Sequence, residues 1–403
     1  MSDATDTAND RLPHLNQAPP SRARERLRGA VESIAVARFS RENRVEVLKN
    51  GDEIFPAMLE ALRAAKRTIE FVTFVYWKGE IAREMAETLA ERAGSGVHVR
   101  VLLDAYGSKP MEPKLIEIMT SAGVEVERFR PIVRWKLWQN DHRTHRKIAV
   151  IDEQVSFTGG VGIASEWEGD ARGPDEWRDT HFRLDGPITL MLKATFLTDW
   201  RDTDHAIDFE DASVKNVDAA GDVDVALVDG SAQIGFDDAE RVLEAMIAGA
   251  EQRILIQTPY FNPTEIVLDL MRDAIERGVE VDLLIPGPNI DKRVSVPMAE
   301  EMFAPLIEIG ARVWIFQPTM MHVKALLVDG TAAMVGSINV NRRSMQKDEE
   351  TALVILDERI AGELEKHFKE DVARSNLSDA EPKNRSFVSK LVSKILKPVR
   401  GEF

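Results

Sequence analysis

The sequence predicts an α/β fold made of two tandem domains of one design. Each would be a β-sheet flanked by helices on both faces, and pseudo-twofold symmetry would relate the two. Three observations predict this fold. Apolar strand-like runs alternate with amphipathic helical segments along most of the chain. The motif His-x-Lys-x4-Asp occurs twice. Several landmarks recur at separations of 177 to 187 residues, which indicates an internal repeat.

The predicted elements follow the same order in the two copies. The first copy reads helix, strand, helix, strand, helix, strand over 54–65, 69–76, 81–93, 97–103, 113–122 and 124–129. The second copy repeats this order over 239–250, 254–260, 263–277, 279–285, 298–309 and 313–316. Matched landmarks include Gly96 with Gly278 and Gly123 with Gly310. Ahead of the first copy, a helix is predicted from a cap at Ser21 through about residue 39.

These patterns divide the chain into five segments. Residues 1–20 are polar and proline-containing, which is typical of a disordered leader. The first domain, with the N-terminal helix, covers 21–208, and the second domain covers 224–375. A linker rich in Asp and Ala, 209–223, joins the two domains, and a tail follows over 376–403.

Composition narrows the possible functions. Of 403 residues, 44% are hydrophobic and 30% are charged, the profile of a soluble globular protein. No apolar run reaches the roughly 18 residues that span a bilayer. The chain has no cysteine, which excludes disulfides and thiolate metal sites and fits a cytoplasmic protein. A net charge of −16 disfavours a broad nucleic-acid-binding surface.

The repeated motif carries the chemistry. His145 and Lys147 in the first copy, and His322 and Lys324 in the second, lie two residues apart, so on an extended strand each pair shares a face. Cleavage of a phosphodiester requires neutralised phosphate oxygens, in-line attack on phosphorus and a proton for the leaving oxygen. One histidine cannot easily act on both sides of one phosphorus. Two domains placed face to face would supply one histidine for each side.

These features resemble those of the phospholipase D superfamily, most closely its bacterial cardiolipin-synthase branch in a cytosolic type without transmembrane helices. The resemblance covers roughly residues 40–375 and implies two phospholipase D-type domains. It is carried by both His-x-Lys-x4-Asp motifs and by four further stretches: Arg143-Thr-His-Arg-Lys147, Trp177-Arg-Asp-Thr-His181, Thr258-Pro-Tyr-Phe261, and Gly336-Ser-Ile-Asn339 followed by Arg343-Ser344.

The resemblance implies a reaction in two steps through a phosphohistidine, without metal or cofactor. His145 is implied to be the nucleophile, and His322 the general acid and then the general base. Lys147 and Lys324 are implied to hold the phosphate oxygens. Asn339 is implied to add an amide donor to the phosphate-binding site.

Each histidine also needs an acidic partner on its other ring nitrogen, which fixes its tautomer. Glu350 follows His322 by 28 residues (350 − 322) and fits the family's position for that acid. Asp179 is the candidate partner of His145, at a longer separation. Glu350 and Asp179 are therefore the predicted histidine-orienting residues.

The motif aspartates, Asp152 and Asp329, complete the candidate catalytic set, but we expect them to support the fold. Each lies five residues after its lysine and so points to the opposite strand face. Two departures from the family pattern bear on substrate specificity. Gly162 stands where the family usually has Asn, and the first half therefore lacks one amide donor. Asn341 and Asp348 stand where the family more often has Asp and Asn.

Two segments indicate contact with a membrane. Residues 383–403 combine apolar residues at helical spacing with a basic opposite face, which predicts a membrane-surface anchor. Packing against the domain or at a dimer contact is the alternative for this helix. The loop 130–138 interleaves basic and aromatic residues. Its Trp135 and Trp138 would either enter the lipid interface or pack in the core.

The sequence therefore predicts a cytoplasmic phosphatidyltransferase, peripherally associated with the inner face of the cell membrane. It would make cardiolipin from two phosphatidylglycerols, with anionic phospholipid and the membrane surface as partners and no nucleic acid. A hydrolytic phospholipase D is the first alternative, and the acidic charge makes a phosphodiesterase nuclease less favourable. A non-enzymatic lipid-binding scaffold is the alternative outside enzymes. The oligomeric state stays open.

Overall fold

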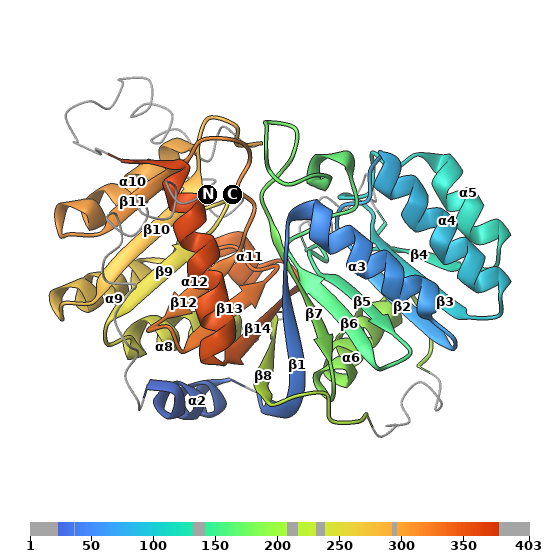
Figure 1. Cartoon of the computed structure of the whole chain (residues 1–403), viewed down its shortest axis with the longest axis horizontal. Coiled ribbons are helices and arrows are strands. Elements are labelled where there is room, and N and C mark those ends of the chain that lie inside the picture. The colour runs from blue at the N-terminus through green and yellow to red at the C-terminus, as the bar shows by residue number, and fades with distance from the viewer. Residues whose placement is uncertain are drawn as a thin grey trace.

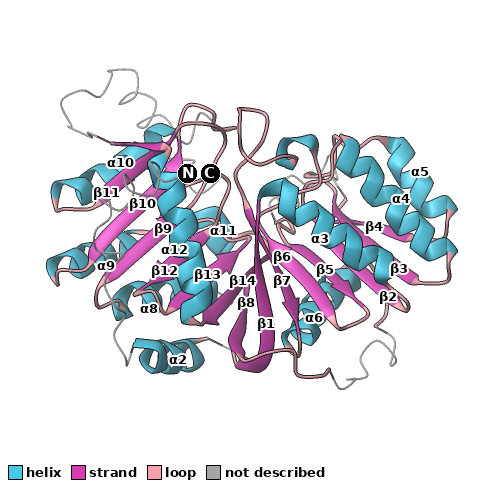
Figure 2. Cartoon of the chain, in the orientation of Figure 1, coloured by secondary structure: helices cyan, strands magenta, loops and turns pink. Residues whose placement is uncertain are grey.

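The computed structural model describes residues 23–35, 37–131, 142–207, 217–230, 238–291 and 296–378. Within these ranges the chain forms one continuous sheet with helices on both faces (Figures 1 and 2). The helices are α2 (Ala23–Ile34), α3 (Asn50–Ala64), α4 (Glu80–Gly94), α5 (Pro113–Ser121), α6 (Ile188–Arg201), α8 (Asp238–Gly249), α9 (Glu265–Glu276), α10 (Val296–Glu308), α11 (Arg342–Gln346) and α12 (Glu358–Ala373), with a 3-10 turn at Ser165–Trp167.

The strands of the first half are β1 (Phe39–Lys49), β2 (Thr68–Thr73), β3 (His98–Asp104), β4 (Glu125–Phe129), β5 (Lys147–Ile151), β6 (Val155–Gly159) and β7 (Thr180–Asp185). Those of the second half are β8 (Val223–Gly230), β9 (Arg253–Gln257), β10 (Glu280–Pro286), β11 (Arg312–Phe316), β12 (Ala325–Val328), β13 (Ala332–Gly336), β14 (Glu350–Leu356) and β15 (Ser375–Leu377).

The strand order shows the predicted pseudo-twofold symmetry. Among the described residues the order is β15-β11-β10-β9-β12-β13-β14-β8-β1-β7-β6-β5-β2-β3-β4. Read outward from the centre, β1-β7-β6-β5-β2-β3-β4 matches β8-β14-β13-β12-β9-β10-β11. Parallel pairs β2–β3–β4 and β9–β10–β11 form the outer parts, and β1 pairs with β8 antiparallel at the centre. The predicted fold is confirmed, with the sheets of the two halves joined edge to edge into one.

Three apolar cores hold the helices on this sheet. One packs α3, α4 and α5 on the first half, and a second packs α8, α9 and α10 on the second half. The third lies at the centre and contains residues of α6 and α12 together with strands of both halves. α6 also contacts β8, and α12 contacts β1. Each half therefore extends one helix over the other, which fixes the two motif regions relative to each other.

The N-terminal region differs from the predicted one. The predicted helix ends early, at Ile34, and strand β1 begins at Phe39. β1 alternates only in its second part, where Val45 and Val47 are buried, because polar residues fill its first part. Although α2 precedes the first half, it packs against α8 of the second half.

Several predicted segments lie outside the described residues. These are the leader 1–20, most of the linker 209–223, the loop residues Trp135 and Trp138, and the basic amphipathic segment 383–403. In the part of the chain that is described, no helix is both long and apolar enough to cross a bilayer.

Candidate active site

The motif aspartates support turns at the start of two strands. Each has a positive φ, +52° for Asp152 and +54° for Asp329. Each carboxylate accepts three consecutive backbone N–H groups, which a strand start would otherwise leave without partners. The donors are Lys66, Arg67 and Thr68 to Asp152 at 2.7–3.0 Å, and Glu251, Gln252 and Arg253 to Asp329 at 2.7–2.9 Å.

The two motif histidines lie just before β5 and β12, and the backbone of the opposite half fixes each of them. The His145 backbone N–H donates to the Glu349 carbonyl at 2.8 Å, and the Glu349 backbone N–H donates to the Arg143 carbonyl at 2.7 Å. In the same way, His322 N–H donates to the Arg178 carbonyl at 2.7 Å. These contacts form short parallel bridges between the halves. As a result, the acid that follows each bridge, Glu350 or Asp179, lies beside the histidine of the other half.

The histidine–acid pairs therefore cross between the halves. His145 Nδ1 lies 3.0 Å from both carboxylate oxygens of Glu350. His322 Nδ1 lies 2.7 Å from Asp179 Oδ2. The predicted pairing, Glu350 with His322 and Asp179 with His145, was wrong because it assumed that each half orients its own histidine. The structure brings all four predicted residues together, with the acids exchanged.

The two acids differ in their electrostatics. Burial raises the pKa of Glu350 to about 8, against the opposing charge of Lys147. Burial would also raise the pKa of Asp179, but the charges of Lys324 and His322 outweigh it and lower that pKa below its ordinary value. Asp179 is therefore ionised at neutral pH.

The two motif lysines lie against their own histidines. Lys147 Nζ donates to the His145 carbonyl at 2.6 Å, and Lys324 Nζ lies 2.8 Å from His322 Nδ1. Burial lowers the pKa of Lys147 to about 8 and that of Lys324 to about 7. Burial, followed by the charge of Lys324, lowers the pKa of His322 to about 4. Each orienting acid, where ionised, raises the pKa of both lysines, so the two motifs form one electrostatic cluster.

The surroundings of the two histidines are not equivalent. Phe74 meets His145 edge-on, with ring centroids 5.0 Å apart. Two tryptophans lie against His322, Trp167 at 5.4 Å and Trp177 at 5.5 Å. The His145 side chain is 15% exposed and that of His322 is 8% exposed. His145 is thus the more accessible of the two histidines.

Comparison with known proteins gives the family. A sequence profile described as "Cardiolipin synthase, PLD-like domain" matches residues 58–166 and 243–372. The chain belongs to this phospholipase D-like family.

Similar proteins of known name agree with the profile match. The chain is 30% identical over 343 residues to "Cardiolipin synthase 1" of Bacillus cereus, covering 82% of this chain and 66% of the relative. It is 33% identical over 374 residues to "Cardiolipin synthase A" of Pseudomonas aeruginosa, covering 89% and 73%. The chain thus spans about 66% of the length of the Bacillus relative.

Solved structures show the same fold. The phosphatidylserine synthase of Haemophilus influenzae matches with a TM-score of 0.68 at 15% identity, over 94% of this chain and 98% of that one. A polyphosphate kinase from Porphyromonas gingivalis matches with a TM-score of 0.55 at 15% identity, over 97% and 56%. At these identities the likeness concerns the fold alone.

The surroundings of Gly162, where the sequence analysis expected an asparagine, leave little space for a side chain. In the second half, Asn339 is buried and its Nδ2 donates to Ser344 Oγ at 3.1 Å. Its Oδ1 has no hydrogen-bond partner among the described residues. In the first half, a Cβ on Gly162 would lie 2.7 Å from the Cβ of Val75. No side chain fits at residue 162 without a shift of its neighbours.

Two buried arginines link the two halves through ion pairs. The sequence alone had suggested no role for them. Arg178 Nε donates to both carboxylate oxygens of Asp371, on α12, at 3.0 and 2.9 Å. Arg146, inside the first motif, donates to Asp199 on α6 and, at 2.6 Å, to Asp229 on β8. An arginine next to an active-site residue in a strand-like run is a usable signal, but its partners lie far away in the sequence.

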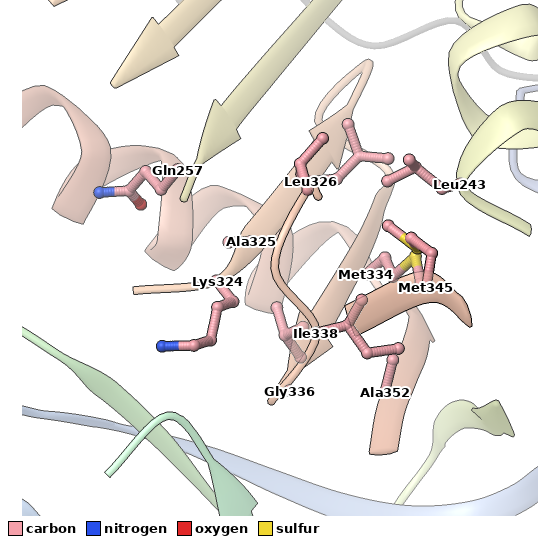
Figure 3. Close-up of a pocket in the computed structure, with 12 residues that line it drawn as sticks. Leu243, Gln257, Lys324, Ala325, Leu326, Met334, Gly336, Ile338, Met345 and Ala352 are labelled. Carbon is pink, nitrogen blue, oxygen red and sulfur yellow. The ribbon is translucent and has the colours of Figure 1, made fainter. Parts of the chain in front are cut away.

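A small cavity lies behind the second motif. It measures about 20 Å³, which is the size of a single water molecule rather than of a lipid headgroup. Figure 3 shows the Lys324 amine directed away from the Leu243, Met334 and Met345 side chains that line the far side. The cavity is therefore a packing gap beneath the site, and Lys324 presents its charge on the opposite side.

Proposed function

We propose that the chain is a phosphatidyltransferase that makes cardiolipin from two phosphatidylglycerols through a phosphohistidine intermediate. One observation carries the proposal: two histidines from opposite halves, each with an acidic side chain on Nδ1 and a lysine beside it, lie in one cluster. The names of the relatives supply the substrate class, since they are called cardiolipin synthases.

In the first step, His145 attacks phosphorus. Its Nδ1 is engaged by Glu350, so Nε2 supplies the electron pair. A bond forms from Nε2 to phosphorus as the bond from phosphorus to the headgroup glycerol oxygen breaks. His322 donates a proton to that oxygen, and glycerol leaves. Lys147 and Lys324 neutralise the phosphate oxygens, and Asn339 adds a donor.

In the second step, the glycerol hydroxyl of another phosphatidylglycerol attacks the same phosphorus. His322, now without its proton, accepts the hydroxyl proton as general base. The new oxygen–phosphorus bond replaces the bond to His145, and cardiolipin leaves. The enzyme returns to its starting protonation state. The scheme uses no metal or cofactor.

The acid role of His322 depends on the substrate charge. With a pKa of about 4, His322 is neutral at pH 7 in the empty site. An anionic phosphodiester would offset the charge of Lys324, which is one cause of that low pKa. The ionised Asp179 on Nδ1 then stabilises the imidazolium. Substrate binding is thereby coupled to proton uptake at His322.

We also propose a location at the inner face of the cell membrane, in the cytoplasm, with residues 383–403 as the anchor and the loop of Trp135 and Trp138 as a second contact. The support is the basic amphipathic pattern of residues 383–403. Deleting 383–403 should reduce binding to phosphatidylglycerol vesicles in a sedimentation assay. Unchanged binding would count against the anchor.

The direct test of the reaction uses the purified chain and phosphatidylglycerol vesicles, with products identified by mass spectrometry. The expected products are cardiolipin and glycerol in equal amounts. Phosphatidic acid without cardiolipin would show that the enzyme hydrolyses the lipid and does not transfer its phosphatidyl group. Absence of any lipid product, together with cleavage of single-stranded DNA, would overturn the lipid function. Vesicle binding without any product, even though the chain is folded, would favour a scaffold.

A further inference from the structure

The two orienting acids obtain their supporting hydrogen bonds in different ways. In the second half, the Ser337 hydroxyl donates to Glu350. Ser337 follows Gly336 at the end of β13, and the matching residue at the end of β6 is Gly160. A Cβ at residue 160 would lie 2.1 Å from Asp179 Oδ1. A serine therefore cannot serve Asp179 as Ser337 serves Glu350.

Trp167 supplies the missing donor in the first half. Its Nε1–H donates to Asp179 Oδ2 at 2.9 Å. The same oxygen lies 2.7 Å from His322 Nδ1, and the backbone N–H of Thr180 donates to Oδ1 at 2.9 Å. The carboxylate is therefore held by three donors, and two of them, the indole and the imidazole, share one oxygen.

The ring of Trp167 also lies beside Gly162 and takes up part of the space in which a side chain at that position would lie. A Cβ at Gly162 would lie 3.1 Å from Trp167 Cζ3. The indole is 1% exposed and meets the His322 ring edge-on at an interplanar angle of 78°. It thus touches both members of the His322–Asp179 pair, whereas its second-half counterparts are the small side chains Ser337 and Asn339.

We propose that Trp167 is a positioning residue for the reaction: its indole N–H and ring fix the Asp179 carboxylate and, through it, the tautomer and orientation of His322. The indole of Trp167 thus supplies the orienting acid of the first half with the donor that Ser337 supplies to Glu350 in the second. The kinetic part of this inference rests on the proposed function.

Replacing Trp167 by Phe keeps an aromatic ring and removes one donor from Asp179 Oδ2. Oδ2 then becomes a stronger acceptor for its remaining donor, the imidazole of His322. The pKa of His322 should rise by about 0.5–1 unit. Looser orientation should lower kcat by about tenfold while KM stays the same, since the indole is buried behind His322.

The test titrates the histidine ring nitrogens by NMR in chain labelled with ¹⁵N-histidine. Trp77→Phe is the matched control, because Trp77 Nε1 donates to the Gly107 carbonyl and not to an orienting acid. We expect the His322 titration to move upward in Trp167→Phe and to stay in place in Trp77→Phe. An unmoved His322 titration in folded Trp167→Phe would overturn the inference.

A second measurement needs no substitution at Trp167. In the unaltered chain, one indole N–H signal should titrate with the pKa of His322. The same signal should show the largest change in chemical shift when Asp179 is replaced in Asp179→Asn, which assigns it to Trp167. If no indole signal follows His322, Trp167 and His322 do not share a carboxylate oxygen and the inference fails. Neither readout requires lipid turnover. A chain that made no cardiolipin would contradict the proposed function but would leave the role of Trp167 to be decided by these two measurements.

Discussion

The buried ion pair between Arg178 and Asp371 offers a quantitative test of how the halves are joined. Arg178 is 0% exposed and Asp371 is 1% exposed, and both carboxylate oxygens accept from Arg178 Nε. Asp371→Asn keeps the shape but leaves a buried guanidinium without its counter-charge. Breaking a buried pair in this way costs about 3–5 kcal/mol. For a chain of 403 residues that corresponds to a fall in Tm of about 4–6 °C.

The control is an exposed pair of the same chemistry. Asp52 lies 3.1 Å from Arg172, with side chains 53% and 65% exposed. Asp52→Asn should cost about 0–1 kcal/mol, because solvent screens exposed pairs. The assay is urea unfolding followed by circular dichroism, with vesicle turnover measured alongside. Asp371→Asn should also lower kcat, because the Arg178 carbonyl accepts the His322 N–H. Equal stability of the two variants would refute the reasoning.

Three further predictions concern the site. His145→Ala and His322→Ala should each lower kcat by about 10⁴-fold, whereas His98→Ala, at an exposed position, should leave it unchanged; full activity in either motif variant would contradict the two-histidine scheme. Because the pKa of Lys324 is lowered to about 7, Lys324 loses its phosphate-binding charge as pH rises, and kcat/KM should fall above pH about 7. In Lys324→Arg the guanidinium stays charged, so the fall should move up to about pH 8, where Lys147 loses its charge; an unmoved fall would speak against this role of Lys324. Gly162→Asn should destabilise the fold by about 1–3 kcal/mol through overpacking, and an unchanged Tm would speak against that.

The periodic parts of the fold could be predicted from the sequence. The strand predicted over 97–103 is observed as β3, His98–Asp104, and the helix predicted over 81–93 is α4, Glu80–Gly94. Both have a regular apolar repeat that the backbone geometry translates directly into structure. β1 was missed because its first part has almost no apolar alternation, and pairing with β7 and β8 holds it in place instead.

The members of the candidate site were predictable, but their pairing was not. His145 and Glu350 are separated by 205 residues, and only the backbone bridge at Glu349 brings them together. A motif specifies residue types within a few positions and carries no information about which half supplies the partner. Trp167 was missed for a related reason, since its indole N–H reaches Asp179 from a 3-10 turn that has no sequence pattern of its own.

The central claim is that both halves act on one phosphorus through a covalent histidine. The direct measurement is a rapid alkaline quench of the enzyme during turnover of phosphatidylglycerol, followed by proteolysis and mass spectrometry. The account predicts a phosphatidyl group on the peptide that contains His145, and none in His145→Ala. An adduct on His322 alone would reverse the two roles, and turnover without an adduct on either histidine would contradict the central claim.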